Sequence, residues 1–191
     1  MLKLKTKPVG IDVPIQKMQT FIHNKLIALW NIDETNGPKY MAYGRCYRNR
    51  DQKYGYIAEN YKGDSITGGV DYEETYWDDN MTVVSFFGVA NSIRHEGTKE
   101  LASVHLVYFL DLAKVKPTIA HRADEEVHKD LLSLVGNVLH GFTYTGLDTG
   151  VDNVLREYPG SRRENRMVAV DMHPRHCFRL NFDLMYHKNI C

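Results

Sequence analysis

The chain has 191 residues, of which 43% are hydrophobic, and its 24 Lys and Arg residues balance 24 Asp and Glu residues. This length and apolar content suit a single domain with a sizeable core, and the neutral charge gives no sign of the basic face that DNA-binding modules carry. Three widely spaced cysteines fit a reducing cytoplasm better than a disulfide framework, and no run of about 18 apolar residues predicts a membrane helix.

The first third of the chain predicts an arm, a helix and a β-hairpin. Residues 1–12 are expected to form an extended arm. A helix is predicted from about Asp12 to Trp30, because Asp is a favourable N-cap and apolar residues recur at helical spacing. This apolar face comprises Ile15, Met18, Ile22, Leu26 and Leu29. The aromatic segments 39–47 and 54–61 flank a polar stretch, which is the pattern of two strands joined in a hairpin.

The middle of the chain predicts a loop followed by strands. Three glycines indicate a flexible loop over residues 62–73, and the longer segment 62–100 is expected to be a loop or hairpin insertion within one domain spanning 1–191. The apolar segment 81–89 and the alternating segment 104–110 predict two strands.

The last third predicts two helices and a closing strand. An acidic first turn favours a helix from Asp124 to near Gly141, and a shorter helix is expected over 148–158, followed by a short strand over 167–171. The closing segment alternates between apolar and polar residues, which is typical of a strand with one buried face. Its buried face is predicted to hold Phe178, Leu180, Phe182, Leu184 and Tyr186, and its other face, meeting solvent or a neighbouring subunit, Arg179, Asn181 and Asp183.

The order of these elements predicts an α+β fold. The strands cluster instead of alternating with helices, which favours an antiparallel or mixed sheet over a parallel one. We expect the N-terminal helix and the second helix, which precedes the final strand, to pack against this sheet.

The histidines and cysteines near the C-terminus are the strongest candidates for chemistry, but their spacing argues against a site within one chain. His176 and His187 are separated by a predicted strand about 35 Å long, so they cannot share an ion. His176 and Cys177 are strand neighbours that point to opposite faces, so they cannot pair as base and nucleophile. His173 lies beside Pro174, which predicts a kink before the strand. We predict no catalytic residue, no metal and no cofactor.

The order of elements and the closing sequence resemble the tail-terminator and tail-completion proteins of tailed phages, which form rings in the neck between head and tail. In that family a Met-x-Pro-x-His-x-Phe pattern often introduces the final strand, and Met172, Pro174, His176 and Phe178 reproduce it. The Tyr-rich hairpin and the closing Leu-Asn-Phe-Asp-Leu-Met-Tyr also resemble ring proteins from phages of gut Bacteroidales, the crAss-like group in particular. The close match covers residues 167–186, and the segment 62–100 departs from the compact core of the family.

The resemblance implies a structural, non-enzymatic virion protein that assembles in the host bacterial cytoplasm, with no membrane involved. It implies a closed homo-oligomeric ring of six-fold or twelve-fold symmetry, in contact with other neck, portal or tail proteins. Such a ring passes DNA through its lumen without reading its sequence. Candidates to face this lumen, or to lie at subunit interfaces, are Arg48, Arg50, Arg162, Arg163 and Arg166. A small cytoplasmic metal-dependent hydrolase that uses the region of His173 and His176 stays open as the alternative.

Overall fold

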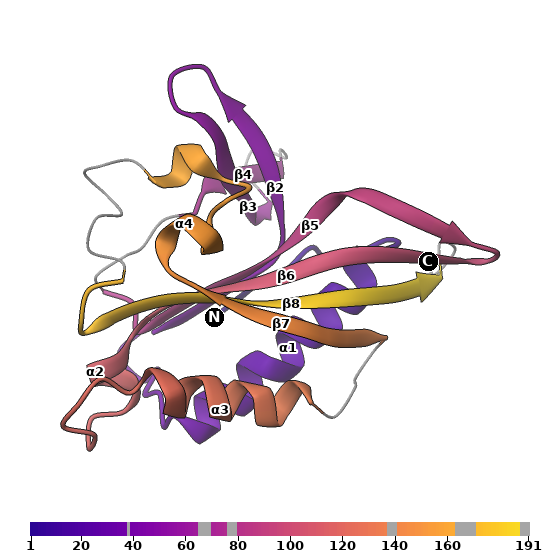
Figure 1. The fold of residues 1–191 in the computed structure, drawn as a ribbon. Coiled ribbons are helices and arrows are strands. Elements are labelled where there is room, and N and C mark those ends of the chain that lie inside the picture. Colours follow the sequence, from indigo (N-terminus) through magenta and orange to yellow (C-terminus); the bar gives the residue numbers. More distant parts are fainter. Residues whose placement is uncertain (38, 65–69, 76–79, 137–140, 163–170, 188–191) are drawn as a thin grey trace.

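A computed structural model describes residues 1–37, 39–64, 70–75, 80–136, 141–162 and 171–187. These residues form an α+β fold, as the sequence predicts, in which one large sheet is covered by helices (Figure 1). The two faces of the sheet carry two separate groups of buried apolar side chains.

The sheet is mixed and mostly antiparallel. Its eight described strands are β1 (Leu2–Lys3), β2 (Tyr40–Asp51), β3 (Gly55–Asp64), β4 (Val70–Glu74), β5 (Val83–Glu96), β6 (Lys99–Asp111), β7 (Phe142–Thr149) and β8 (Arg175–His187). Their order is β4-β3-β2-β5-β6-β8-β7, and β1, from the predicted N-terminal arm, pairs with β2. β2 runs parallel to β1 and β5, whereas all the other neighbouring pairs are antiparallel. The closing strand β8 therefore lies inside the sheet, between β6 and β7.

The helices lie on opposite sides of the sheet (Figure 1). They are α1 (Asp12–Leu29), α2 (Leu112–Val115), α3 (Asp124–Val135), α4 (Val151–Val154) and the 3-10 helix η1 (Pro159–Arg162). The apolar residues of α1 and α3 pack against one face, which forms the main core. The segment containing α4 covers a smaller apolar group on the second face. The predicted apolar stripe of α1 is buried apart from its last member, Leu29, which is 49% exposed.

The strand β8 supports the predicted alternation on one face and corrects it on the other. All five apolar residues expected to be buried, from Phe178 to Tyr186, are buried. Arg179, expected on the polar face that meets solvent or a neighbouring subunit, is only 1% exposed. Asn181 and Asp183 are half-buried. The polar face is covered because the chain after β7 crosses over it (Figure 1).

The glycine-containing segment after the hairpin differs from the flexible loop expected over 62–73. β3 continues to Asp64, and β4 pairs with it in antiparallel orientation. The register shifts at Gly63, whose φ of 138° favours glycine, so this residue marks an irregularity within a strand pair. The expected insertion over 62–100 is in part integral to the sheet, since β5 lies between β2 and β6.

Residues 142–158 contain a strand that the sequence did not predict. β7 is an edge strand that includes Asp148, and only Val151–Val154 of the helix expected over 148–158 is α-helical. The helix expected to reach Gly141 ends at Val135. The strand expected over 167–171 falls outside the described residues except for Asp171, which lies in a turn.

Candidate functional site

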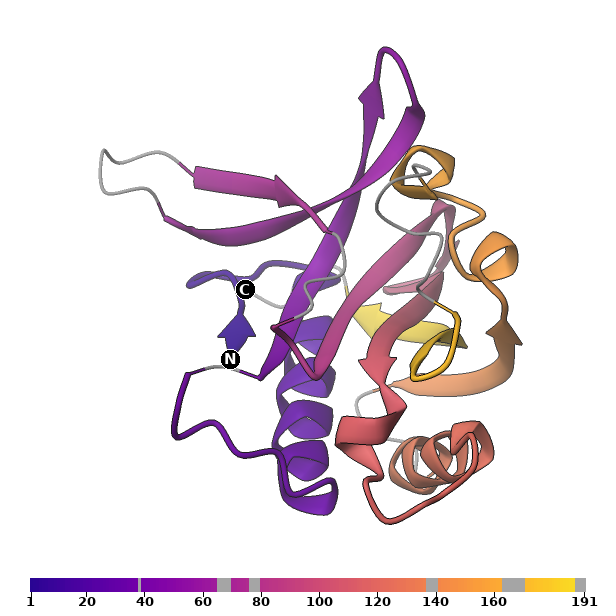
Figure 2. The same ribbon diagram turned by 90° about the vertical axis from the view of Figure 1, so that its left-hand side faces the viewer.

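The predicted site arginines divide between the hairpin and the segment that starts with Arg162, the last residue of η1. Arg48 and Arg50 lie on β2 and are exposed. They belong to the β2–β3 hairpin, which projects beyond the other strands of the sheet (Figures 1 and 2). The backbone of Arg162 ends η1, and Arg163 and Arg166 lie outside the described residues. The structure therefore describes the side chains of two of these five arginines, Arg48 and Arg50, and places both on the exposed end of β2.

Arginine and lysine side chains stack on tyrosines along this hairpin. The guanidinium carbon of Arg48 lies 3.8 Å from the ring centroid of Tyr56, and Lys53 Nζ lies 4.9 Å from that of Tyr54. In the strand register, Arg50 is opposite Tyr56, so Arg48, Arg50 and Tyr56 share one face. Such cation–π contacts hold the cations in place while leaving them accessible to a partner. We call Arg48, Arg50, Lys53, Tyr54 and Tyr56 the hairpin surface.

The base of the hairpin is joined to the body by polar contacts on its other face. Arg45 lies 5.0 Å from the ring centroid of Tyr47, which meets Tyr72 of β4 edge to face at 5.6 Å. Lys5 donates a hydrogen bond to Asp12 at 2.7 Å and another to the Tyr47 hydroxyl. The N-terminal arm therefore contacts both α1 and the hairpin.

A buried arginine holds the chain that follows β7. Arg179 donates from Nε to Asp148 Oδ2 at 2.9 Å and from Nη1 to Glu157 Oε2 at 2.6 Å. Asn181 also donates to Asp148 Oδ2, at 3.0 Å, and the half-exposed Arg156 contacts both carboxylates from the solvent side. Burial raises the pKa of both carboxyl groups, but hydrogen bonds and positive charge from these neighbours outweigh it, so both pKa values lie below their ordinary range. We call these five residues the Arg179 cluster.

A neutral histidine lies beside this cluster. Burial lowers the pKa of His105 to about 4, so its imidazole is uncharged at neutral pH. Its Nε2 lies 3.4 Å from the hydroxyl of Tyr158, whose ring meets Phe86 edge to face. A Cβ on Gly88 would lie 2.1 Å from His105 Nε2, so only glycine fits at position 88. The second face is thus tightly packed around the Arg179 cluster.

The segment 150–161, which we call the connection, ends against the hairpin. The backbone N–H of Ala58 on β3 donates to Ser161 Oγ at 2.9 Å, and the Ala58 carbonyl accepts from the Thr75 N–H at 2.9 Å. A Cβ on Gly160 would lie 2.9 Å from the carbonyl oxygens of Tyr54 and Tyr56. The close approach of η1 to β3 thus satisfies a backbone donor that would otherwise be buried and unpaired.

A second titratable cluster joins the start of β8 to α3. Asp171 Oδ1 accepts a hydrogen bond from His176 Nδ1 at 2.7 Å and another from Arg122 Nη2 at 3.0 Å. The Nε2 atoms of His176 and His128 are 3.0 Å apart, so one of them carries the proton and the other accepts it. Burial and the nearby His176 lower the pKa of His128.

The histidines and the cysteine near the start of β8 are the sequence-based candidates for metal binding or catalysis. His173 is exposed, whereas His176 is 2% exposed and has both ring nitrogens hydrogen-bonded within the chain. Among the residues that the structure describes, no group of three or more His, Cys, Asp or Glu side chains is placed to hold a metal ion. Cys177 is buried on the second face, away from the His176 contacts with α3. Burial raises the pKa of the Cys46 thiol to about 12 and that of Cys177 as well, so neither is a thiolate at neutral pH.

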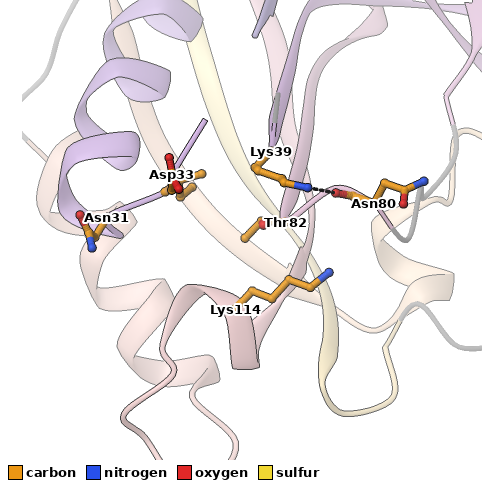
Figure 3. A pocket seen from close by; sticks show the side chains of 7 residues that line it. Asn31, Asp33, Lys39, Asn80, Thr82 and Lys114 are labelled. Carbon is orange, nitrogen blue, oxygen red and sulfur yellow. Dashed lines mark hydrogen bonds between the residues drawn. The ribbon is translucent and has the colours of Figure 1, made fainter. Parts of the chain in front are cut away.

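A recess of about 300 Å³ lies where α1, β2, β5 and α2 meet. Figure 3 shows Lys39 and Lys114 directed toward Asn80, with Thr82 between them and Asn31 and Asp33 set apart. Lys39 Nζ donates to the Asn80 carbonyl at 3.5 Å. The lining mixes both charges with amides and selects no single class of ligand.

The comparisons with known proteins add no relative: no family model and no curated protein matches this chain. Within the described residues, even α1, the longest helix, lacks the apolar stretch needed to cross a membrane.

Proposed function

We propose that this protein is a structural virion subunit that forms a ring in the neck of a tailed phage, joining the head or portal to the tail. The projecting β2–β3 hairpin is the observation that carries this proposal (Figure 2). It presents exposed cations and tyrosines at its end, while β2 contacts the N-terminal arm through Tyr47 and β3 contacts the connection through Ala58. A rigid projection of this kind suits an interface with a neighbouring subunit.

The composition of the hairpin surface supports an interface between copies. Arg and Tyr are enriched at protein interfaces, where they offer large contact areas with polar ends. A ring requires a heterologous contact, in which a projection on one copy meets a different surface on the next. The equal numbers of acidic and basic residues allow such copies to pack densely without strong mutual repulsion.

The ring would surround the DNA passage, with Arg48 and Arg50 at its lumen or at its subunit boundaries. Contact with DNA there would be made through phosphates and without sequence specificity. Other neck, portal and tail proteins would bind the two ends of the ring. We assign the protein to the virion and propose no reaction for it, since the Arg179 cluster is held by hydrogen bonds among its own members and His176 bonds to Asp171 and His128.

The test is the assembly state of the purified protein, measured by mass photometry and negative-stain electron microscopy. We expect closed rings with six-fold or twelve-fold symmetry. Arg48→Glu combined with Arg50→Glu should prevent ring formation while leaving the circular dichroism spectrum unchanged. The matched control reverses two exposed lysines on the helices, Lys17→Glu with Lys129→Glu, and should assemble normally.

A stable monomer at all concentrations, together with absence of the protein from purified phage particles, would overturn the proposal. The hydrolase alternative makes a different prediction. It requires a metal ion bound after purification and a hydrolytic activity that His176→Ala abolishes.

A further inference from the structure

The centre of the second face holds a charged side chain where the sequence pattern places a solvent-facing one. Arg179 is 1% exposed, in the middle of β8. Burying a guanidinium removes it from water at a cost of several kcal/mol, which its carboxylate partners must offset. A hydrophobic residue of similar length would fill the same space without that cost. The arginine is therefore better explained by what it positions than by what it stabilises.

The guanidinium of Arg179 joins two points of the chain that lie on either side of α4. Asp148 is near the end of β7, and Glu157 follows α4. The two hydrogen bonds, 2.9 Å from Nε and 2.6 Å from Nη1, use separate edges of one planar group. This geometry fixes the direction as well as the distance of both partners.

The path from Glu157 to the hairpin is short. The next residue, Tyr158, is buried against Phe86 and His105, which prevents the chain from sliding along the sheet. Three residues later, Ser161 Oγ accepts the hydrogen bond from the Ala58 N–H of β3. Gly160 lies so close to the hairpin backbone that no side chain would fit there.

We infer that Arg179 is a positioning residue for the β2–β3 hairpin. It clamps the connection at Glu157 and the end of β7 at Asp148, and the connection in turn sets the position of β3 through Ser161 and Ala58. The clamp is a property of the single chain. Only its consequence for ring assembly rests on the proposed function.

Hydrogen exchange of the Ala58 amide, measured by NMR on the purified protein, tests this inference. Ser161→Ala removes the acceptor directly and sets the reference, with exchange faster by about tenfold or more, as expected for the loss of one buried hydrogen bond. Arg179→Met should accelerate Ala58 exchange to a similar extent. The Leu106 amide, in the centre of the sheet beside β8, reports global unfolding, so the Ala58 amide should exchange faster than Leu106 in both variants.

A double-mutant cycle separates the clamp from a general loss of stability. Glu157→Gln should reproduce the effect of Arg179→Met, and the double variant should exchange no faster than either single one. Arg156→Met, which alters the half-exposed arginine of the same cluster, should change Ala58 exchange by less than about twofold. Arg179→Lys keeps the charge but lacks the planar fork, so it should restore part of the protection and is informative even if Arg179→Met does not fold.

Native-like protection of Ala58 in folded Arg179→Met, or exchange of Ala58 only at the global-unfolding rate that Leu106 reports, would overturn the inference. Ring assembly gives a separate result. If Ala58 exchange responds as expected but the native protein never forms rings, the clamp stands and the proposed function is wrong. If both hold, Ser161→Ala and Arg179→Lys should weaken assembly together.

Discussion

The two faces of the sheet are stabilised by different kinds of contact. On one face, Phe178, Leu180 and Phe182 of β8 pack against the apolar residues of α1 and α3. On the other face, Arg179 and Asn181 of the same strand bind Asp148 of β7, and Arg179 also binds Glu157 in the chain that follows β7. Alternate residues of one strand thus serve an apolar layer and a charged layer.

This difference separates stability from position. The free energy gained from apolar packing is proportional to the area removed from water, and such packing tolerates small shifts of a helix over a sheet. A planar guanidinium bound to two carboxylates tolerates little change in angle or distance. We therefore expect the α1 and α3 face to supply most of the folding free energy and the Arg179 face to fix the placement of the connection and the hairpin.

Arg179→Met alone has the largest expected effect on the stability of the fold. It leaves two carboxylates partly buried without their main partner, which should lower the free energy of unfolding by about 3–5 kcal/mol. Adding Asp148→Asn and Glu157→Gln removes those charges and should restore most of the loss. Urea denaturation of the single and triple variants measures both values. Equal stability of the single and triple variants would show that the unpaired carboxylates do not cause the loss of stability.

Leu180→Ala tests the apolar face with a slightly smaller expected effect. Leu180 is fully buried in the main core, so its truncation should cost about 2–4 kcal/mol through lost burial and a residual cavity. It should leave the Ala58 amide no more exposed than other amides of the sheet. Met185→Ala on the same strand, 39% exposed, is the control and should change stability by at most about 0.5 kcal/mol.

A third comparison uses pH, because the buried histidines of the two faces respond in the same direction. The folded pKa of His105, about 4, lies below its ordinary value, so between these values the unfolded chain binds more protons and stability falls as the pH falls. His128, whose pKa is also lowered, adds to the loss. From pH 7 to pH 5 the expected loss from His105 alone is about 2 kcal/mol.

Thermal denaturation across this range checks the histidine prediction. The carboxyl groups of Asp148 and Glu157 contribute only at lower pH, because their lowered pKa values keep them ionised above it. His105→Gln should flatten the dependence between pH 7 and pH 5, whereas His121→Gln, at an exposed position, should not. An unchanged slope in His105→Gln would mean that His105 is not neutral in the folded protein.

The sequence predicts the apolar face well and the charged face poorly, for a physical reason. Periodicity reports which residues avoid water, so the buried residues of α1 and the apolar positions of β8 follow from it directly. Arg179 carries no such signal, because its burial depends on Asp148 and Glu157, which are 31 and 22 residues away in the chain. β7 was not predicted either. Its short sequence contains Gly146, and the pairing register between β7 and β8 shifts beside this residue.

The candidate site was predictable in part. The alternation of the hairpin places Arg48 and Arg50 on one face, and pairing with the second strand brings Tyr56 to them once the register is known. The register itself depends on the turn and on the contact between Ser161 and Ala58, which joins residues 103 apart. The role of these arginines at a ring interface stays a prediction.

The smallest expected change in stability comes from the hairpin surface, and it sharpens the distinction between stability and position. Arg48→Lys keeps the positive charge but loses the planar stacking on Tyr56, so the free energy of unfolding should change by at most about 0.5 kcal/mol. If the stacked guanidinium is part of the contact between copies, ring dissociation should become about tenfold more favourable, as measured by mass photometry over a dilution series. Arg94→Lys, on the exposed end of the β5–β6 hairpin, is the matched control and should not alter assembly. Equal behaviour of the two variants would mean that the stacking of Arg48 on Tyr56 is not part of the contact between copies.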